Sequence, residues 1–185
     1  ALATLNAMID EWQNESLMIY TRTRNVYSLV SGTQTYTLGP GGAFALDPRP
    51  VRIDIATIIN LANPAMPLEL PLEMFTTERW AGIPVKNVQS ALPLGVYDDG
   101  GFPLRNLSYY PIPNVAVQTA LYTWTALSRF ADLVTNYTFP PGYEKAIRYN
   151  LALDLAPEYG RPLQAVVAAQ AVSSKAKVKA INVPL

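Results

Sequence analysis

The chain has 185 residues, with 14 Lys and Arg against 14 Asp and Glu, and it contains no Cys and no His. The balanced charge gives no global attraction for nucleic acid, and the missing residue types exclude disulfides, Cys-based zinc sites and a Ser-His-Asp triad. Only 15% of the residues are charged, so part of the surface is expected to be covered by another subunit.

No apolar run approaches the ~18 residues of a membrane span, and no signal-peptide pattern opens the chain. We therefore expect a soluble protein made in a reducing cytoplasm, without membrane contact, metal or cofactor. Without His and Cys, any catalysis would depend on carboxylate, Lys or Tyr side chains.

Residues 1–19 show the period of an amphipathic helix. Apolar side chains recur on one face at Leu2, Leu5, Ile9 and Trp12, and the charged and amide residues lie on other faces. The spacing predicts a helix over this range.

The next segment alternates as a β-strand does. Val26, Ser28 and Val30 share one side, and Thr35–Leu38 resumes the strand pattern after a turn, so the sequence predicts a β-hairpin with its turn near Gly32. An isolated two-stranded ribbon is marginal in water, so we expect contact with a neighbouring subunit or with another protein to order it. The residues predicted to make that contact are Tyr27, Leu29, Gly32, Tyr36 and Leu38.

Further strands are predicted in the middle of the chain. The β-branched run 51–62 is typical of a covered strand, and residues 115–127 alternate clearly. Residues 94–97 and 107–110 are expected to pair around an Asp-Asp-Gly-Gly turn.

The same region is rich in proline. A short helix is predicted over 70–84, with Pro71 near its start and Gly82 at its end. Most of the 16 prolines fall at turns, which favours long ordered loops within a β-rich insertion of about 22–135.

Helical period returns in the last third of the chain. A helix is predicted over about 141–158 and another over 162–174, each beginning near proline. Residues 175–185 are expected to form an extended tail, because the three lysines in it are spaced by two residues and do not share one helical face.

Asp154 and Glu158 lie four residues apart and raise the possibility of a general acid with a carboxylate partner. Pro157 cannot donate a backbone hydrogen bond to the preceding turn, so the helix is expected to kink or end near Ala156. A helix end is therefore the favoured interpretation, and we expect no enzyme activity.

These elements predict an α+β fold. In it, N- and C-terminal helices form a helical bundle, and a β-rich, proline-rich insertion lies between them. The whole of 1–185 is expected to be a single domain.

Four stretches carry a resemblance to a known family. In chain order they are LNAMIDEWQNESLMIYTRT, VSGTQTYTLG, RPVRI and FPPGYEKAIRYNLALDLAPEYG. Together they resemble the head-to-tail adaptors, or tail accessory factors, of short-tailed bacteriophages. The resemblance spans nearly the whole chain, and it is loose over about 60–130.

The resemblance implies a structural virion protein at the head–tail junction, made in the host cytoplasm. Its partners would be the portal protein above, the tail or nozzle protein below, and copies of itself in a ring of twelve. Packaged DNA would pass through the channel without sequence-specific binding, and the ring would support genome retention and ejection.

The tail is the segment predicted to dock on the portal. We expect it to be disordered in the free monomer and to fold on binding, so that deleting 173–185 leaves the body folded. The residues predicted to contact the portal are Lys175, Lys177, Val178, Lys179, Ile181, Val183 and Leu185.

Two other functions stay open at this stage. One is a cell-wall-degrading carboxylate hydrolase carried in the tail, which would use Asp154 and Glu158. The other is a β-rich receptor- or carbohydrate-binding tail module. The aromatic residues Tyr109, Tyr110, Tyr122 and Trp124 could stack on bases or sugars, although packing is favoured because no basic residues are interleaved with them.

Overall fold

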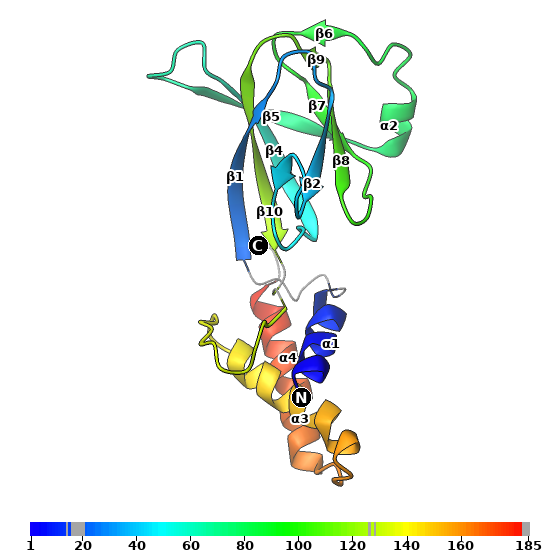
Figure 1. Ribbon diagram of the computed structural model, residues 1–185, viewed down its shortest axis with the longest axis vertical. Coiled ribbons are helices and arrows are strands. Elements are labelled where there is room, and N and C mark those ends of the chain that lie inside the picture. Colours follow the sequence, from blue (N-terminus) through cyan, green and yellow to red (C-terminus); the bar gives the residue numbers. More distant parts are fainter. Residues whose placement is uncertain (14, 16–20, 126, 128, 183–185) are drawn as a thin grey trace. The chain divides into compact units, whose positions relative to one another are not determined.

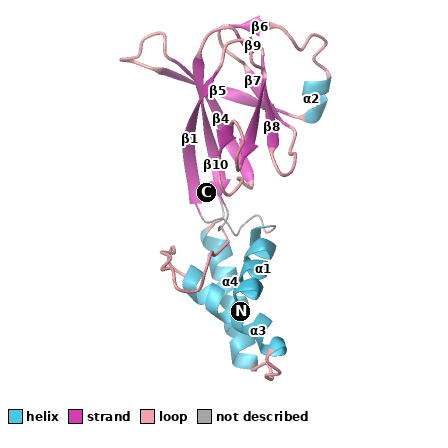
Figure 2. Cartoon of the chain, viewed as in Figure 1, coloured by secondary structure: helices cyan, strands magenta, loops and turns pink. Residues whose placement is uncertain are grey.

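The computed structural model describes residues 1–13, 15, 21–125, 127 and 129–182, and the chain folds as two compact units (Figure 1). The first, here called the helical unit, comprises Ala1–Tyr20 and Ala126–Leu185. The second, the β unit, comprises Thr21–Thr125 and is inserted between the two segments of the first. Apart from one short helix, α2 (Thr77–Ala81), the described helices belong to the helical unit (Figure 2).

The β unit is built on an eight-stranded sheet with the order β1-β10-β4-β5-β7-β8-β2-β3. Most neighbours are antiparallel, and the β2–β3 and β5–β7 pairs are parallel. Its strands are β1 (Thr21–Leu29), β2 (Thr35–Gly39), β3 (Phe44–Ala45), β4 (Arg52–Asn60), β5 (Leu68–Phe75), β7 (Gly95–Asp98), β8 (Arg105–Tyr110) and β10 (Val117–Thr125). A small second sheet pairs β6 (Gln89–Ser90) with β9 (Ile112–Pro113).

The large sheet curls into a nearly closed barrel. Across the closure, the ring of Tyr27 on β1 stacks on Phe44 of β3, with centroids 4.4 Å apart. The backbone N–H of Val30 donates to the hydroxyl of Tyr36 at 2.7 Å. The predicted fold class was therefore wrong: the chain is mostly β, and the core is not that of a helical bundle with an insertion. The strands are long and regular enough to enclose a core of their own.

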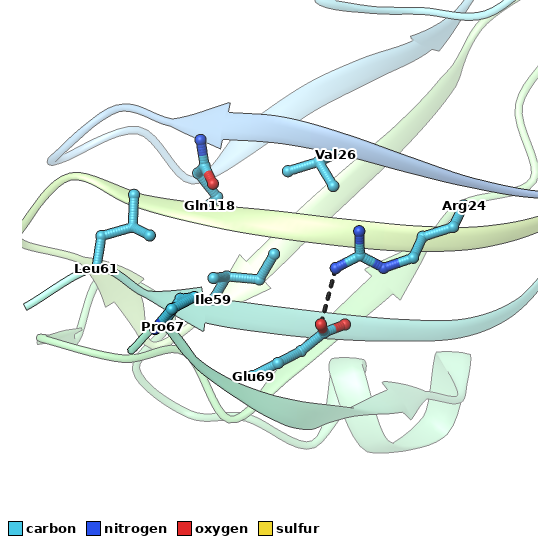
Figure 3. A pocket seen from close by; sticks show the side chains of 7 residues that line it. All are labelled: Arg24, Val26, Ile59, Leu61, Pro67, Glu69 and Gln118. Carbon is cyan, nitrogen blue, oxygen red and sulfur yellow. Dashed lines mark hydrogen bonds and ion pairs between the residues drawn. The ribbon is translucent and has the colours of Figure 1, made fainter. Parts of the chain in front are cut away.

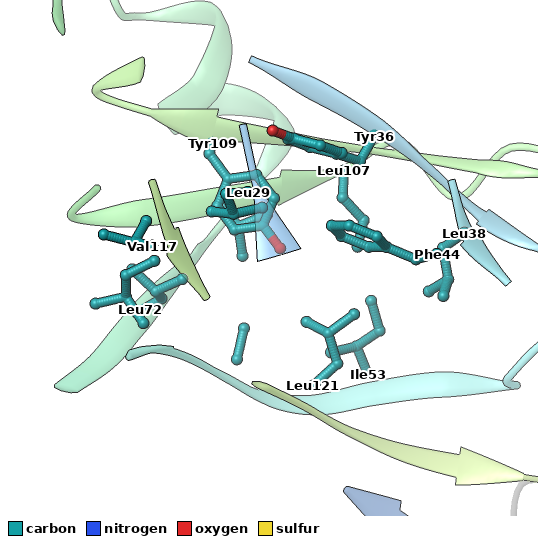
Figure 4. Close-up of a cluster of buried hydrophobic side chains, with 13 residues drawn as sticks. Leu29, Tyr36, Leu38, Phe44, Ile53, Leu72, Leu107, Tyr109, Val117 and Leu121 are labelled. Atoms are coloured by element: carbon teal, nitrogen blue, oxygen red, sulfur yellow. The ribbon is translucent and has the colours of Figure 1, made fainter. Parts of the chain in front are cut away.

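The barrel interior holds the main core of the β unit (Figure 4). On β10 the odd-numbered residues, among them Val117, Thr119 and Leu121, point inward and are buried. Two of the buried hydroxyls form a chain of hydrogen bonds: Tyr109 donates to Thr119 Oγ1 at 3.2 Å, and Thr119 donates to the Thr57 carbonyl at 2.8 Å. Burial raises the pKa of the Tyr109 hydroxyl, so Tyr109 is neutral and acts as a donor in this core.

The predicted hairpin with a turn near Gly32 was wrong as a pairing, although both of its strands exist. β1 pairs with β10, and β2 pairs with β8 and β3, so the two strands are not hydrogen-bonded to one another as a ladder. The apolar sides of both strands face the same interior. Each strand buries more by pairing around the barrel than an isolated ribbon would.

The predicted helix over 70–84 was wrong in its first half. Residues Leu68–Phe75 form β5, in which Pro71 is paired in register with Thr57 of β4. The helix begins only after Thr76, whose side chain accepts from the Arg79 backbone N–H at 3.3 Å, and it ends before Gly82 as expected. The predicted pairing of 94–97 with 107–110 was confirmed by the antiparallel β7–β8 ladder.

The helical unit contains α1 (Leu2–Gln13), α3 (Tyr143–Glu158) and α4 (Ala165–Ile181). The apolar face predicted for the first helix was confirmed within Leu2–Gln13, and residues 14 and 16–19 of that prediction lie outside the described residues. Asn6 binds the loop before α3 twice, because its amide donates to the Phe130 carbonyl and accepts from the Phe130 N–H. The buried core of this unit is Leu5, Met8, Ile9, Trp12, Leu127, Phe130, Tyr143, Ala146 and Val178.

Candidate functional site

The carboxylates Asp154 and Glu158 lie on the last two turns of α3, which ends in a glycine-terminated turn. Gly160 has a φ of +60°, its N–H bonds to the Pro157 carbonyl at 3.1 Å, and the Arg161 N–H bonds to the Ala156 carbonyl at 2.9 Å. This pair of bonds is the Schellman motif that closes a helix and turns the chain. The predicted helix end was confirmed, two residues later than expected.

The two carboxylates have different surroundings. The Thr4 hydroxyl donates to Glu158 at 3.1 Å. Asp154 as a whole residue is exposed, but its carboxyl group is partly buried. This partial burial and the nearby charges of Glu11 and Glu158 raise the pKa of Asp154, and the charge of Lys175 opposes the rise. Among the described residues, no cluster of three or more His, Cys, Asp or Glu side chains could hold a metal ion.

The described residues of the predicted portal-binding tail, Lys175–Ile181, are part of α4 and not of an extended segment. Val178 is fully buried in the core of the helical unit, and Lys175 and Lys179 both form ion pairs with Glu15. Lys177 and Ile181 are exposed. Val183 and Leu185 lie outside the described residues. The prediction of an extended tail over 175–181 is thus corrected, because the two lysines four residues apart share a face after all.

The residues predicted to form a contact hairpin lie mostly in the core of the β unit. Leu29, Tyr36 and Leu38 are buried, and Tyr27 is half-buried against Phe44. Gly32, at a φ of +80°, is exposed at the turn. Three of the five predicted contact residues therefore have buried side chains that no partner can reach from outside the barrel.

Sequence reasoning missed a polar network on the outer face of the β unit. Glu69 on β5 accepts from Thr57 Oγ1 at 2.6 Å, from Arg24 at 2.8 Å and from the Tyr122 hydroxyl at 3.3 Å. Arg24 Nε donates to the same Tyr122 hydroxyl at 3.0 Å. The network ties four strands together, and Figure 3 shows the Arg24–Glu69 pair reaching from β1 to β5. The hydrogen bond from Thr57 and the Arg24 guanidinium hold the pKa of Glu69 below its ordinary value.

Beside this network, three side chains form a stack across three strands. The guanidinium of Arg22 on β1 lies 4.2 Å from the ring centroid of Trp124 on β10, and that of Arg52 on β4 lies 4.6 Å from it. Arg52 is also paired with Asp54 at 2.7 Å. Arginines therefore do lie beside two of the four aromatic rings singled out from the sequence, those of Trp124 and Tyr122, but they come from neighbouring strands and not from the same strand. Alternation of Arg22 with Arg24 on β1 is the sequence signal for this arrangement.

Two hollows lie on either side of Arg24 on this outer face. One, of about 300 Å³, is lined by residues of β1, β10 and β4 that include Arg22, Ile55 and Trp124. The other, of about 220 Å³, is lined by Arg24, Val26, Ile59, Leu61, Pro67, Glu69 and Gln118 (Figure 3). The outer face of the β unit thus offers arginine side chains next to small apolar recesses.

The helical unit offers a different kind of surface on α4. Val166, Val172 and Ile181 are 71%, 70% and 69% exposed. Ala169, Ala176 and Ala180 are exposed as well, and Lys177 is the exposed charged residue of this helix. α3, by contrast, exposes charged residues such as Glu144 and Arg148. An apolar helix face of this kind favours a protein partner.

No protein-family model matches the sequence, and no curated protein sequence is significantly similar to it. The resemblance to head-to-tail adaptors therefore rests on the four stretches quoted above. None of the described helices combines the length and the apolar character needed to span a bilayer.

Proposed function

We propose that the chain is a ring-forming virion adaptor that joins the portal of a short-tailed bacteriophage to its tail. In this proposal it continues the DNA channel and helps to retain the packaged genome. The observation that carries the proposal beyond resemblance is the exposed apolar face of α4. A helix that buries Ala171, Ser174 and Val178 on one side and exposes valine and alanine on another is suited to packing between two protein surfaces.

In this proposal the segment that docks on the portal is the helix α4, and not the disordered tail expected from the sequence. α4 carries three lysines and no acidic residue, and two of the lysines are used by Glu15 within the chain. Lys177 and the exposed apolar face of α4 therefore remain available to contact a partner. A portal surface with apolar grooves and acidic rims would complement them.

The test is docking of the purified chain to purified portal rings, observed by electron microscopy and by sedimentation. The variant Ala176→Glu places a charge on the apolar face of α4, and Ala152→Glu makes the same change at an exposed position of α3. We expect the first variant to lose docking by at least about tenfold and the second to dock normally. Equal docking of both variants would contradict the assignment to α4, and a wild-type chain that never binds portal rings would contradict the proposed function.

The second candidate is the carboxylate hydrolase, which would use Asp154 and Glu158 on the last two turns of α3. The double variant Asp154→Asn with Glu158→Gln separates the two functions. The adaptor proposal expects no peptidoglycan-degrading activity in the wild type and normal docking in the double variant. Activity in the wild type that disappears in the double variant would favour the hydrolase.

A further inference from the structure

Phe102 lies in the turn between β7 and β8 and is 86% exposed. The phenylalanines that lie on strands of the same unit, Phe44 and Phe75, are buried. The ring of Phe102 is therefore a large apolar group that the β unit leaves open to solvent. Aromatic side chains presented in this way are frequent anchors of protein interfaces.

The ring is held in place by an ordered turn. The N–H groups of Gly101 and Asn106 both donate to Asp99 Oδ1, each at 2.8 Å. The guanidinium of Arg49 donates to the Gly101 carbonyl and lies 5.3 Å from the centroid of the Phe102 ring. Because the turn is already fixed by these bonds, burying the ring against a partner costs little conformational entropy.

The hollow of about 220 Å³ on the outer face has the size and the lining to take such a ring. An engineered apolar cavity of about 150 Å³ binds benzene, so a phenyl ring fits the space available here. Val26 and Leu61 at the hollow are 41% and 37% exposed, so a ring placed there would cover apolar surface that is now open to solvent. The apolar residues around the hollow are Val26, Ile59, Leu61 and Pro67 (Figure 3).

The charges beside this hollow favour an uncharged occupant. Arg24 and Glu69 pair with each other at 2.8 Å, so a charged side chain entering the hollow would compete with an existing ion pair. A phenyl ring needs no partner of this kind. On the other surface, Asp98 next to the turn is paired with Arg105 at 2.7 Å, so this carboxylate would not be left uncompensated in a contact.

The ring and the hollow lie at opposite ends of the large sheet (Figure 1). Leu61 and Pro67, which line the hollow, flank the turn between the antiparallel strands β4 and β5. Because β5 and β7 are parallel, the β7–β8 turn that carries Phe102 lies at the other end. One copy can therefore give its ring to one neighbour and receive a ring from another. Such a heterologous contact closes into a ring of subunits when the rotation between copies allows it.

We propose that Phe102 of one copy of the chain inserts into the hollow of about 220 Å³ on a second copy, where it packs on Val26 and Leu61. This contact joins neighbouring copies of the chain. The proposal rests on the ring-forming part of the proposed function, and it names the two surfaces by which the copies meet. Both surfaces belong to the β unit, whereas docking on the portal is assigned to α4.

The test measures self-association of the full chain by sedimentation velocity over a range of concentrations. Phe102→Ala removes the ring, and Val26→Trp fills the hollow. The matched controls are Leu94→Ala, which truncates another exposed residue of the β unit, and Ser28→Trp, which adds the same ring to the same face of β1 outside the hollow. We expect the first two variants to associate at least about tenfold more weakly than the wild type and the controls to associate normally.

A mixture of the two interface variants gives a second, independent measurement. The Phe102→Ala chain has an open hollow and no ring, and the Val26→Trp chain has the ring and a filled hollow. Each copy then has one usable surface, so we expect the mixture to form one-to-one dimers and nothing larger. The wild-type chain, which has both surfaces, is expected to form larger species as its concentration rises. Dimers in the mixture also show that both variants are folded.

Several outcomes would overturn the proposal. A wild-type chain that stays monomeric up to millimolar concentration, or equal association of Phe102→Ala and Leu94→Ala, would show that the contact does not form. Wild-type association that stops at dimers would indicate a two-fold pair. Association that is lost in Ala176→Glu but kept in Phe102→Ala would assign it to α4. If self-association fails while docking to portal rings is normal, the adaptor function stands without this contact, and the reverse result would contradict the adaptor function alone.

Discussion

The two units of the chain differ in how completely they bury their apolar side chains. The β unit encloses a core of Leu, Ile, Val and aromatic side chains, and it covers its outer face with polar networks such as the one around Glu69. The helical unit has a smaller core and leaves a row of Val and Ala exposed on α4. The β unit therefore buries its apolar side chains within itself, whereas the helical unit leaves on α4 the apolar face that we propose a partner covers.

The largest expected effect comes from deleting residues 173–185. The deletion removes Val178 from the core of the helical unit and both lysine partners of Glu15. The structure reverses the expectation from sequence that the body would stay folded. We expect the helical unit to lose its cooperative unfolding transition in calorimetry, while the transition of the β unit is retained. Loss of both transitions would contradict the independence of the two units.

The next largest effect is expected inside the barrel. Leu121 is fully buried, so Leu121→Ala should lower the free energy of unfolding of the β unit by about 2–5 kcal/mol, through lost transfer energy and a residual cavity. Chemical denaturation followed by tryptophan fluorescence, with Trp12 and Trp80 replaced by Phe in both the reference and the variant so that Trp124 alone reports, measures this change. Leu94→Ala is the control, since Leu94 is 69% exposed and its truncation should change stability by less than about 0.5 kcal/mol. Similar losses for both variants would mean that the core is placed wrongly.

A smaller effect is expected from the ion pairs of Glu15. Burial alone would raise the pKa of Glu15, but Lys175 and Lys179 outweigh it and the pKa is lowered. Replacing both lysines by Met should cost the helical unit about 1 kcal/mol at neutral pH, and Lys177→Met should cost nothing measurable. Because a lowered folded-state pKa stabilises only while the carboxylate is ionised, the cost should vanish as pH falls below this pKa. A cost that is independent of pH would point to lost packing instead.

The smallest effect concerns Glu69. Its lowered pKa stabilises the β unit above its unfolded-state value of 4.5, and that contribution is lost as pH falls through the folded-state value. We expect Glu69→Gln to flatten the pH dependence of β-unit stability as the pH falls through and below 4.5. Thr57→Val should act in the same direction and Thr57→Ser should not. An unchanged pH profile in Glu69→Gln would show that the network does not contribute in this way.

The sequence predicted most strands and helices but not their arrangement. Alternation marked β1, β4 and β10 because each has one side that faces a core, and the Asp-Asp-Gly-Gly turn predicted the β7–β8 pair. Pairing of β1 with β10, which are nearly a hundred residues apart, has no local signal. The helical period predicted α1 and α3, and it predicted only the first part of α4, because the alternating lysines of 175–179 are also typical of an extended segment.

The interaction surfaces were even less visible in the sequence. The arginines and aromatic rings of the outer face come from separate strands, so no single stretch contains the pattern. Tyr36 and Leu38 looked like contact residues because a two-stranded ribbon would expose them. Only the closed arrangement of the barrel shows that Tyr36 and Leu38 are buried in its core. Burial depends on which strands meet, and that is set by long-range pairing.

The pairing of Thr21 with Thr125 has a consequence for how such a chain is assembled from parts. The first and last residues of the β unit are direct partners in antiparallel strands, so their Cα atoms lie about 4.5–5.5 Å apart. A segment that leaves and re-enters at neighbouring points can be cut out, or exchanged for another, with a two-residue link in its place. Residues 21–125 therefore form a transferable cassette, and a gene encoding the helical unit could gain, lose or replace it in one step.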